Sequence, residues 1–233
     1  MKTTMFETET RRTANKTIHR KTSVPTRIAL IALTALLALP AISIDPPVAA
    51  KGTQRTVTRT FRGPTVELIT TGNTSPISAS ASYPSEITID GRKGKIRDVN
   101  VRLTNLDHAR PDDLELLLVG PQGQTAIVLA DVGGTTLITD VSLRLDDEAA
   151  TLLPDASTLQ SGSFQPTNAT GAAITFNAPA PSANASAALS VFDGTDPNGT
   201  WRLFAQDDDA PTGIGFFDSW ALEITAKVKK RKR

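Results

Sequence analysis

The sequence has no cysteine, two histidines and few aromatic residues, and each shortage excludes a class of chemistry. Without cysteine there is no disulfide scaffold, no thiolate nucleophile and no cysteine-based zinc site. A serine protease triad needs a histidine as base, and only His108 follows residue 50. Because His108 stands beside Asp107, we expect a solvated loop residue. No serine lies in a nucleophile context, so the sequence predicts a protein that is not an enzyme.

Sustained helical periodicity is also missing, whereas glycine and proline each occur fifteen times. Short segments alternate between apolar and polar residues, as in residues 99–104, 141–145 and 220–224. Such alternation is typical of strands with one buried face. With about eight or nine strands separated by turn signals, the fold class predicted is all-β, a sandwich or jelly roll.

No apolar run reaches the roughly 20 residues that a membrane-spanning helix needs. The run Ile28–Ala41 follows a basic segment and precedes the small residues Val48 to Ala50. This order is typical of a secretory signal peptide. We expect residues 1–50 to be removed near Ala50, which predicts a secreted, extracellular protein without stable membrane insertion. The alternative is an uncleaved anchor.

Basic residues are few in the part of the chain that is rich in acidic residues. Residues 96–226 carry five basic and eighteen acidic side chains, whereas residues 1–50 carry seven basic and three acidic ones. An acidic module argues against nucleic acid as a partner. It favours bound cations, most simply Ca²⁺, because calcium takes oxygen ligands.

One nearly continuous apolar stretch organises the chain. Asp112 and Asp113 lead into Leu114–Val119, and Gly120 and Pro121 close the stretch. A strand without alternation is expected to be buried on both faces. The charges at its entrance need compensation.

Acidic loops elsewhere in the chain would compensate these charges if they bound one cation together with Asp112 and Asp113. Loops distant in sequence can meet at one end of a β-sandwich, and Ca²⁺ needs about 6–8 oxygens. The sequence therefore predicts a structural calcium site. The alternative is a solvated acidic surface with turn-forming aspartates. The predicted ligands are Asp112, Asp113, Asp131, Asp207, Asp208 and Asp209.

Several segments in order resemble one family. They are Ile96–Val101, Asn105–Pro121, Asp131–Gly134, Pro166–Asn168, Phe192–Leu203, and Asp207-Asp208 with Trp220–Ile224. Together they resemble the P domain, or P/Homo B domain, which follows the subtilisin-like catalytic domain in kexin, furin and related bacterial serine proteases. The resemblance implies a galactose-binding-like jelly-roll β-sandwich, association with serine endopeptidases and, in bacterial members, frequent calcium.

The resemblance sets the expected domain limits. Residues 81–226 form the P/Homo B domain, residues 51–80 a linker or loose edge strand, and residues 227–233 a basic tail. The tail either binds an anionic surface or is a disordered terminus. Only about thirty residues separate the expected cleavage site from the first matching strand, too few for a subtilisin fold.

The predicted function is a secreted, non-catalytic module stabilised by calcium. Its partner would be a separate secreted protease, or an extracellular protein or glycan. The alternative is a carbohydrate- or cell-envelope-binding jelly roll that uses Trp201 and Trp220 as an aromatic platform. Both tryptophans lie in apolar strands, so core packing is the favoured interpretation.

Overall fold

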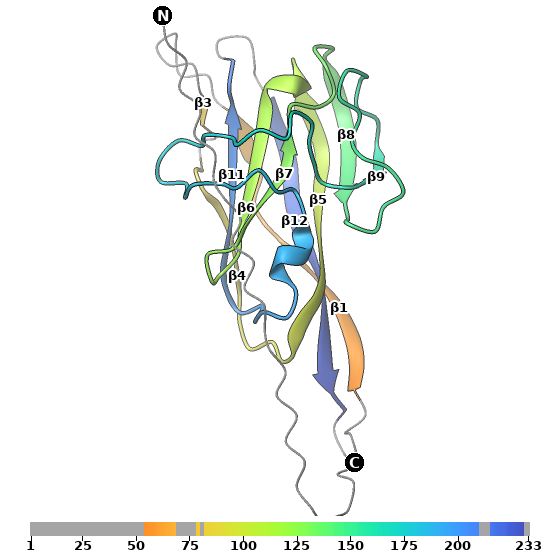
Figure 1. Cartoon of the computed structure of the whole chain (residues 1–233), viewed down its shortest axis with the longest axis vertical. Helices are drawn as coiled ribbons and strands as arrows, with labels where there is room; N and C mark the ends of the chain where they lie inside the picture. The colour runs from red at the N-terminus through yellow and green to blue at the C-terminus, as the bar shows by residue number, and fades with distance from the viewer. Residues whose placement is uncertain (1–53, 69–77, 80–81, 210–214, 231–233) are drawn as a thin grey trace, which may run out of the picture. The chain divides into compact units, whose positions relative to one another are not determined.

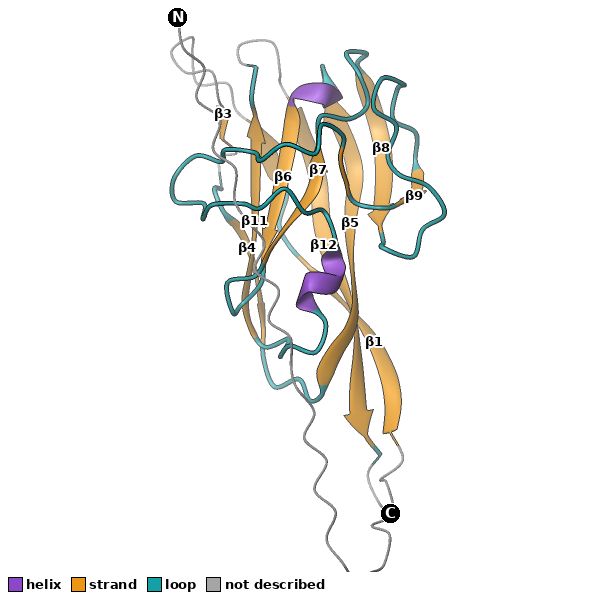
Figure 2. Cartoon of the chain, in the orientation of Figure 1, coloured by secondary structure: helices purple, strands orange, loops and turns teal. Residues whose placement is uncertain are grey.

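The computed structural model describes residues 54–68, 78–79, 82–209 and 215–230 (Figure 1). The predicted export segment, residues 1–50, lies outside the described residues. The described chain is built from strands and two short 3₁₀ turns, and it contains no α-helix in these ranges (Figure 2). No helix in these ranges has the length and apolar character needed to cross a bilayer.

The strands form two six-stranded sheets. The first sheet has the order β1-β12-β5-β8-β9, with β2 also paired to β12. Its strands are β1 (Gln54–Arg62), β2 (Val66–Leu68), β5 (Lys95–His108), β8 (Ile138–Leu145), β9 (Gly162–Phe164) and β12 (Gly215–Lys229). The second sheet has the order β10-β7-β6-β11-β3, with β4 also paired to β11. Its strands are β3 (Ser78–Ala79), β4 (Ser85–Ile89), β6 (Leu114–Val119), β7 (Thr125–Ala130), β10 (Thr167–Asn168) and β11 (Gly199–Asp207).

One continuous apolar core joins the two sheets. Alternate residues of each strand point inward, because successive side chains of a strand leave on opposite faces. Leu116, Leu203 and Trp201 of the second sheet share this core with Val101 and Leu222 of the first. The predicted all-β sandwich is confirmed.

The central strand β6 is buried on both faces, as its unbroken apolar sequence predicts. Leu114, Leu116 and Leu118 face the core between the sheets. Leu117 and Val119 face outward, where Phe176 and Ile174 cover them. The sequence pattern of Ile174–Phe176 predicts a short strand, but this covering segment is irregular, so that prediction is wrong. Its apolar side chains pack on the sheet without joining it.

Three other segments differ from the sequence pattern. The acidic sequence of residues 146–150 is compatible with one helical turn, but residues 147–150 form turns and bends instead. Asn198-Gly199 is a hairpin signal in the sequence, but the turn that contains it joins the 3₁₀ turn η2 (Leu189–Phe192) to β11 and closes no hairpin. Strand β12 includes Lys227 and Lys229, which the sequence pattern places in the basic tail. Strand β1 occupies part of the expected linker as an exposed edge strand, where β12 supplies backbone partners.

Candidate cation site

The register of the second sheet brings three strand ends together. In the β6–β11 pair, Leu114 at the start of β6 stands opposite Asp207 at the end of β11. In the β6–β7 pair, Leu116 stands opposite Leu129, so β7 also ends here. Acidic residues that begin or follow these strands therefore gather at one end of the sheet, although up to about a hundred residues separate them.

Three carboxylates from these strand ends converge. Glu115, Asp131 and Asp208 each place one oxygen so that all three oxygens lie within 4.8 Å of one another. We call these three residues the strand-end cluster. They line a surface hollow together with the irregular segment from Thr170 to Thr175. Glu115 is 4% exposed, whereas Asp208 is exposed. The hollow is therefore acidic at its floor and open to solvent.

Hydrogen bonds fix two of these carboxylates. Gln206 donates its amide to Oε2 of Glu115 and to the carbonyl oxygen of Thr175. Thr170 donates its hydroxyl to Oδ2 of Asp131 over 2.8 Å. The irregular segment thus holds both carboxylates while it covers the outer face of the sheet.

The Gly-Gly loop after Asp131 can be made only by glycine at its centre. Gly133 has φ of +87°, and a Cβ there would lie 2.6 Å from Cγ of Leu159. A side chain would meet both a left-handed backbone conformation and a collision. Glycine therefore allows a tight loop after Asp131. Asp131, a member of the cluster, also has a left-handed backbone conformation, with a φ of 54°.

The carboxylates of the cluster repel one another unless a cation binds between them. Burial raises the pKa of Glu115 to about 7, against a hydrogen bond from Gln206 that lowers it. Burial, followed by the charge of Asp131, also raises the pKa of Asp208. Glu115 and Asp208 each lose solvation and face like charges, so their ionisation is disfavoured.

A second group of acidic residues lies beside the cluster and forms ion pairs with one arginine. Nε of Arg110 lies 3.3 Å from Oδ2 of Asp113, and its Nη1 lies 3.0 Å from Oδ2 of Asp209. Burial nevertheless raises the pKa of Asp113 to about 6. Burial also raises the pKa of Asp112, with the charges of Asp131 and Asp155 adding to the shift. The single arginine therefore compensates only part of the negative charge here.

His108 is buried, so the solvated loop residue expected from the sequence is wrong. It ends β5 with 0% exposure, and its Nε2 lies 3.5 Å from Oδ2 of Asp207, which is also 0% exposed. Its Nδ1 accepts a hydrogen bond from the backbone N–H of Arg110. Burial lowers the pKa of His108, which favours a neutral imidazole with its proton on Nε2, facing Asp207. Because β5 and β11 belong to different sheets, this pair joins the sheets across the core.

The raised pKa values predict how stability varies with pH in calcium-free buffer. Burial raises the pKa of Glu115 to about 7 and the pKa of Asp207 to about 6. The folded protein then binds more protons than the unfolded chain between about pH 4 and pH 7, so stability falls as pH rises through this window. We expect a lower melting temperature at pH 7.5 than at pH 5, measured by circular dichroism. Glu115→Gln should flatten the dependence, and a melting temperature that rises over this range would contradict it.

The structure thus places the six predicted ligands at one end of the sandwich but in different settings. Asp131 and Asp208 belong to the strand-end cluster, and Asp112 lies beside it. Asp113 and Asp209 pair with Arg110, and Asp207 pairs with His108. Calcium binding by any of the six stays a prediction.

Glu115 is the cluster member that the sequence pattern missed. It occupies an outward position in an otherwise apolar strand, between Leu114 and Leu116. A charged residue inside a strand that is buried on both faces needs a partner. That mismatch is the signal that could have identified it.

The tryptophans form part of the core. Trp201 and Trp220 are both 0% exposed. Trp201 stacks edge-to-face on Phe192 and donates its N–H to the carbonyl of Pro197. Trp220 donates its N–H to Oγ of Ser85. Core packing is confirmed, and neither ring is presented to a sugar.

The strand-end cluster fits a hard cation by its donor chemistry. It offers carboxylate oxygens only, and Ca²⁺ prefers oxygen ligands at 2.3–2.6 Å. Two ligands on opposite sides of one calcium are then about 5 Å apart, which the 4.8 Å spacing allows. Glu115, Asp131 and Asp208 would hold the ion, and the hollow leaves its outer side open to water.

Comparison with known proteins gives only distant structural likeness. No protein-family model and no curated protein matches the chain. A chain in the crystal structure of the Aeromonas sobria serine protease and chaperone complex is 15% identical, with a TM-score of 0.37 over 77% of this chain and 28% of that one. The crystal structure of the serine protease of Aeromonas sobria gives 18% identity and a TM-score of 0.33, covering 74% of this chain and 27% of that one. The present chain thus spans less than a third of either chain, and likeness at this level assigns no family and no activity.

Proposed function

We propose that this protein is an exported, non-catalytic β-sandwich module that calcium stabilises and that works alongside a separate serine endopeptidase. The observation that carries the proposal is the strand-end cluster. Glu115, Asp131 and Asp208 lie at the ends of three separate strands and meet in an acidic hollow. Bringing three carboxylates together costs free energy unless a cation compensates them, so calcium would fix the ends of β6, β7 and β11.

The association with an endopeptidase rests on the sequence. The ordered segments resembling the P/Homo B domain extend from Ile96 to Ile224, and that domain accompanies subtilisin-like proteases. The export signal expected in residues 1–50 favours a partner in the same extracellular space.

A non-catalytic role fits the position of the single histidine in the described ranges. A general base must reach the proton that it removes. His108 is fully buried between the sheets and faces Asp207 and the backbone N–H of Arg110. A substrate has no access to this imidazole, so His108 would act in the core.

The proposal is tested by incubating the purified chain with an unfolded protein substrate in calcium buffer. We expect no cleavage that a serine-directed inhibitor blocks. The tagged chain should instead recover a serine endopeptidase from the secreted fraction of its host, and chelator should weaken that recovery. Inhibitor-sensitive cleavage by the chain itself, abolished by His108→Gln, would refute the non-catalytic role. Failure to recover any endopeptidase activity, with or without calcium, would refute the association.

A further inference from the structure

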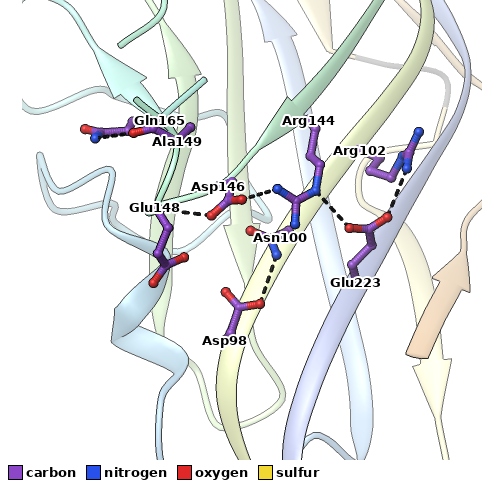
Figure 3. Close-up of polar contacts among 9 residues, drawn as sticks. All are labelled: Asp98, Asn100, Arg102, Arg144, Asp146, Glu148, Ala149, Gln165 and Glu223. Atoms are coloured by element: carbon purple, nitrogen blue, oxygen red, sulfur yellow. Dashed lines mark hydrogen bonds and ion pairs between the residues drawn. The ribbon is translucent and has the colours of Figure 1, made fainter. Parts of the chain in front are cut away.

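A second group of carboxylates lies on the first sheet, outside the strand-end cluster. Asp98 belongs to β5, whereas Asp146 and Glu148 follow directly after β8. One oxygen from each lies within 4.8 Å of the others. Figure 3 shows the Asp98 and Glu148 carboxylates facing the same space beside Asp146.

An asparagine supplies a fourth oxygen that has no protein partner. Asn100 is 2% exposed, and its Nδ2 donates to Oδ2 of Asp98 over 2.9 Å. Its Oδ1 is buried and accepts no hydrogen bond. In Figure 3 the amide lies between the Asp98 and Asp146 carboxylates, with its oxygen on the side of Asp146. A buried acceptor without a partner is unfavourable, and a carboxylate cannot donate to it.

The neighbouring arginines leave negative charge uncompensated. Arg144 donates to Asp146 and, over 3.0 Å, to Oε2 of Glu223. Arg102 donates to the other oxygen of Glu223. Counting Asp98 and Glu148, four carboxylates face two guanidinium groups. Two negative charges remain, which is the charge that a divalent cation balances.

We propose that Asp98, Asp146, Glu148 and the side-chain oxygen of Asn100 form a second calcium site. All four donors are oxygens, two of them from one short turn and two from alternate residues of one strand. The three carboxylate oxygens, within 4.8 Å of one another, fit around an ion with bonds of 2.3–2.6 Å. The ion would also provide the unpartnered Asn100 oxygen with its missing contact.

The charge crowding at this place agrees with the proposed ion. The Asp146 carboxylate in contact with Glu148 raises the pKa of Glu148 to about 7. Burial, and then the charge of Asp146, raises the pKa of Asp98. The same crowding of negative charge favours a bound cation at this position.

Calcium here would tie a turn to the sheet at a specific position. The pairing of β5 with β8 ends at Val101 and Leu145. Beyond it the turn residues 146–149 are held by other contacts, including the amide of Gln165 on the carbonyl oxygen of Ala149 (Figure 3). Asp147 accepts backbone N–H groups of Leu189 and Ser190 at the start of η2. An ion at Asp98 would therefore connect β5 to both the turn and η2.

The proposal is tested by titrating calcium into the purified, calcium-free chain by isothermal calorimetry at pH 7.5. We expect two equivalents of bound calcium. The double variant Asp98→Asn/Glu148→Gln should retain one equivalent and weaken or abolish the other, by roughly 10–100-fold or more, the loss that even an outer-shell change causes. The matched control is the double variant Asp90→Asn/Glu67→Gln, which removes equal charge from residues outside both clusters. This control should keep two equivalents.

A second variant separates ligation from a folding defect. Asn100→Leu removes the unpartnered oxygen, so the melting temperature in chelator should change little, whereas the affinity of one equivalent should fall by about tenfold or more. Unchanged binding in both the double variant and Asn100→Leu would overturn this site. The strand-end cluster is tested separately by Glu115→Gln/Asp208→Asn. If only Glu115→Gln/Asp208→Asn removes an equivalent of calcium, only the strand-end cluster binds the ion. If only Asp98→Asn/Glu148→Gln removes one, only the second site binds it.

Discussion

Saturating calcium should raise the melting temperature of this protein markedly. A ligand that binds only the folded state adds RT ln(1 + [L]/Kd) to its stability, or about 2.7 kcal/mol at a hundredfold excess over Kd. For a domain of this size that corresponds to roughly 5–10 °C. The physical reason is that Glu115, Asp131 and Asp208 exchange mutual repulsion for a shared ion. The measurement is a thermal melt in chelator and in excess calcium at pH 7.5.

Substitutions assign the effect to the strand-end cluster. Glu115→Gln/Asp208→Asn should reduce the calcium-dependent shift strongly, while raising the melting temperature in chelator because repulsion is relieved. Asp209→Ala should reduce it less, since Asp209 pairs with Arg110. Asp90→Asn, which removes one negative charge outside both clusters, should leave the shift intact. An identical melt in chelator and in calcium would refute the site.

The general architecture could be predicted from local sequence pattern. Alternation in Val99 to Leu103 and in Trp220 to Ile224 identifies strands with one core face, because the side-chain period of a strand is two. The unbroken apolar run after Leu114 identifies a strand covered twice. Its cover could not be assigned, since Ile174 and Phe176 look like a strand and are apolar for a different reason: they pack on a sheet from an irregular segment.

The candidate sites could be predicted only in part. Acidic loops pointed to Asp131 and Asp208, but their partner Glu115 lies inside a strand, and its role depends on sheet register. The group around Asp98 has no loop signature, because it joins alternate residues of β5 to a turn about fifty residues later. The pairing of strands that are distant in sequence decides which carboxylates meet. No local sequence pattern contains that information.

Replacing His108 by leucine should destabilise the protein by about 2–3 kcal/mol, the upper part of the range for leaving a buried acceptor without its partner. Leucine fills much of the imidazole volume, so the loss reports the polar contact more than a cavity. The variant leaves Asp207 buried at 0% exposure without the Nε2 group that faces it. The measurement is urea unfolding at pH 7.5 in calcium-free buffer.

The pairing partner supplies the decisive comparison. Asp207→Asn removes the charge but keeps an oxygen that can accept the backbone N–H of Asp209, as Asp207 does now. In that background His108→Leu should cost less, by about 1–2 kcal/mol, because no buried charge is left uncompensated. Equal costs in both backgrounds would show that the imidazole acts by packing alone. A cost of His108→Leu below about 0.5 kcal/mol, typical of surface positions, would instead place His108 in solvent and remove the contact that joins the two sheets at this end.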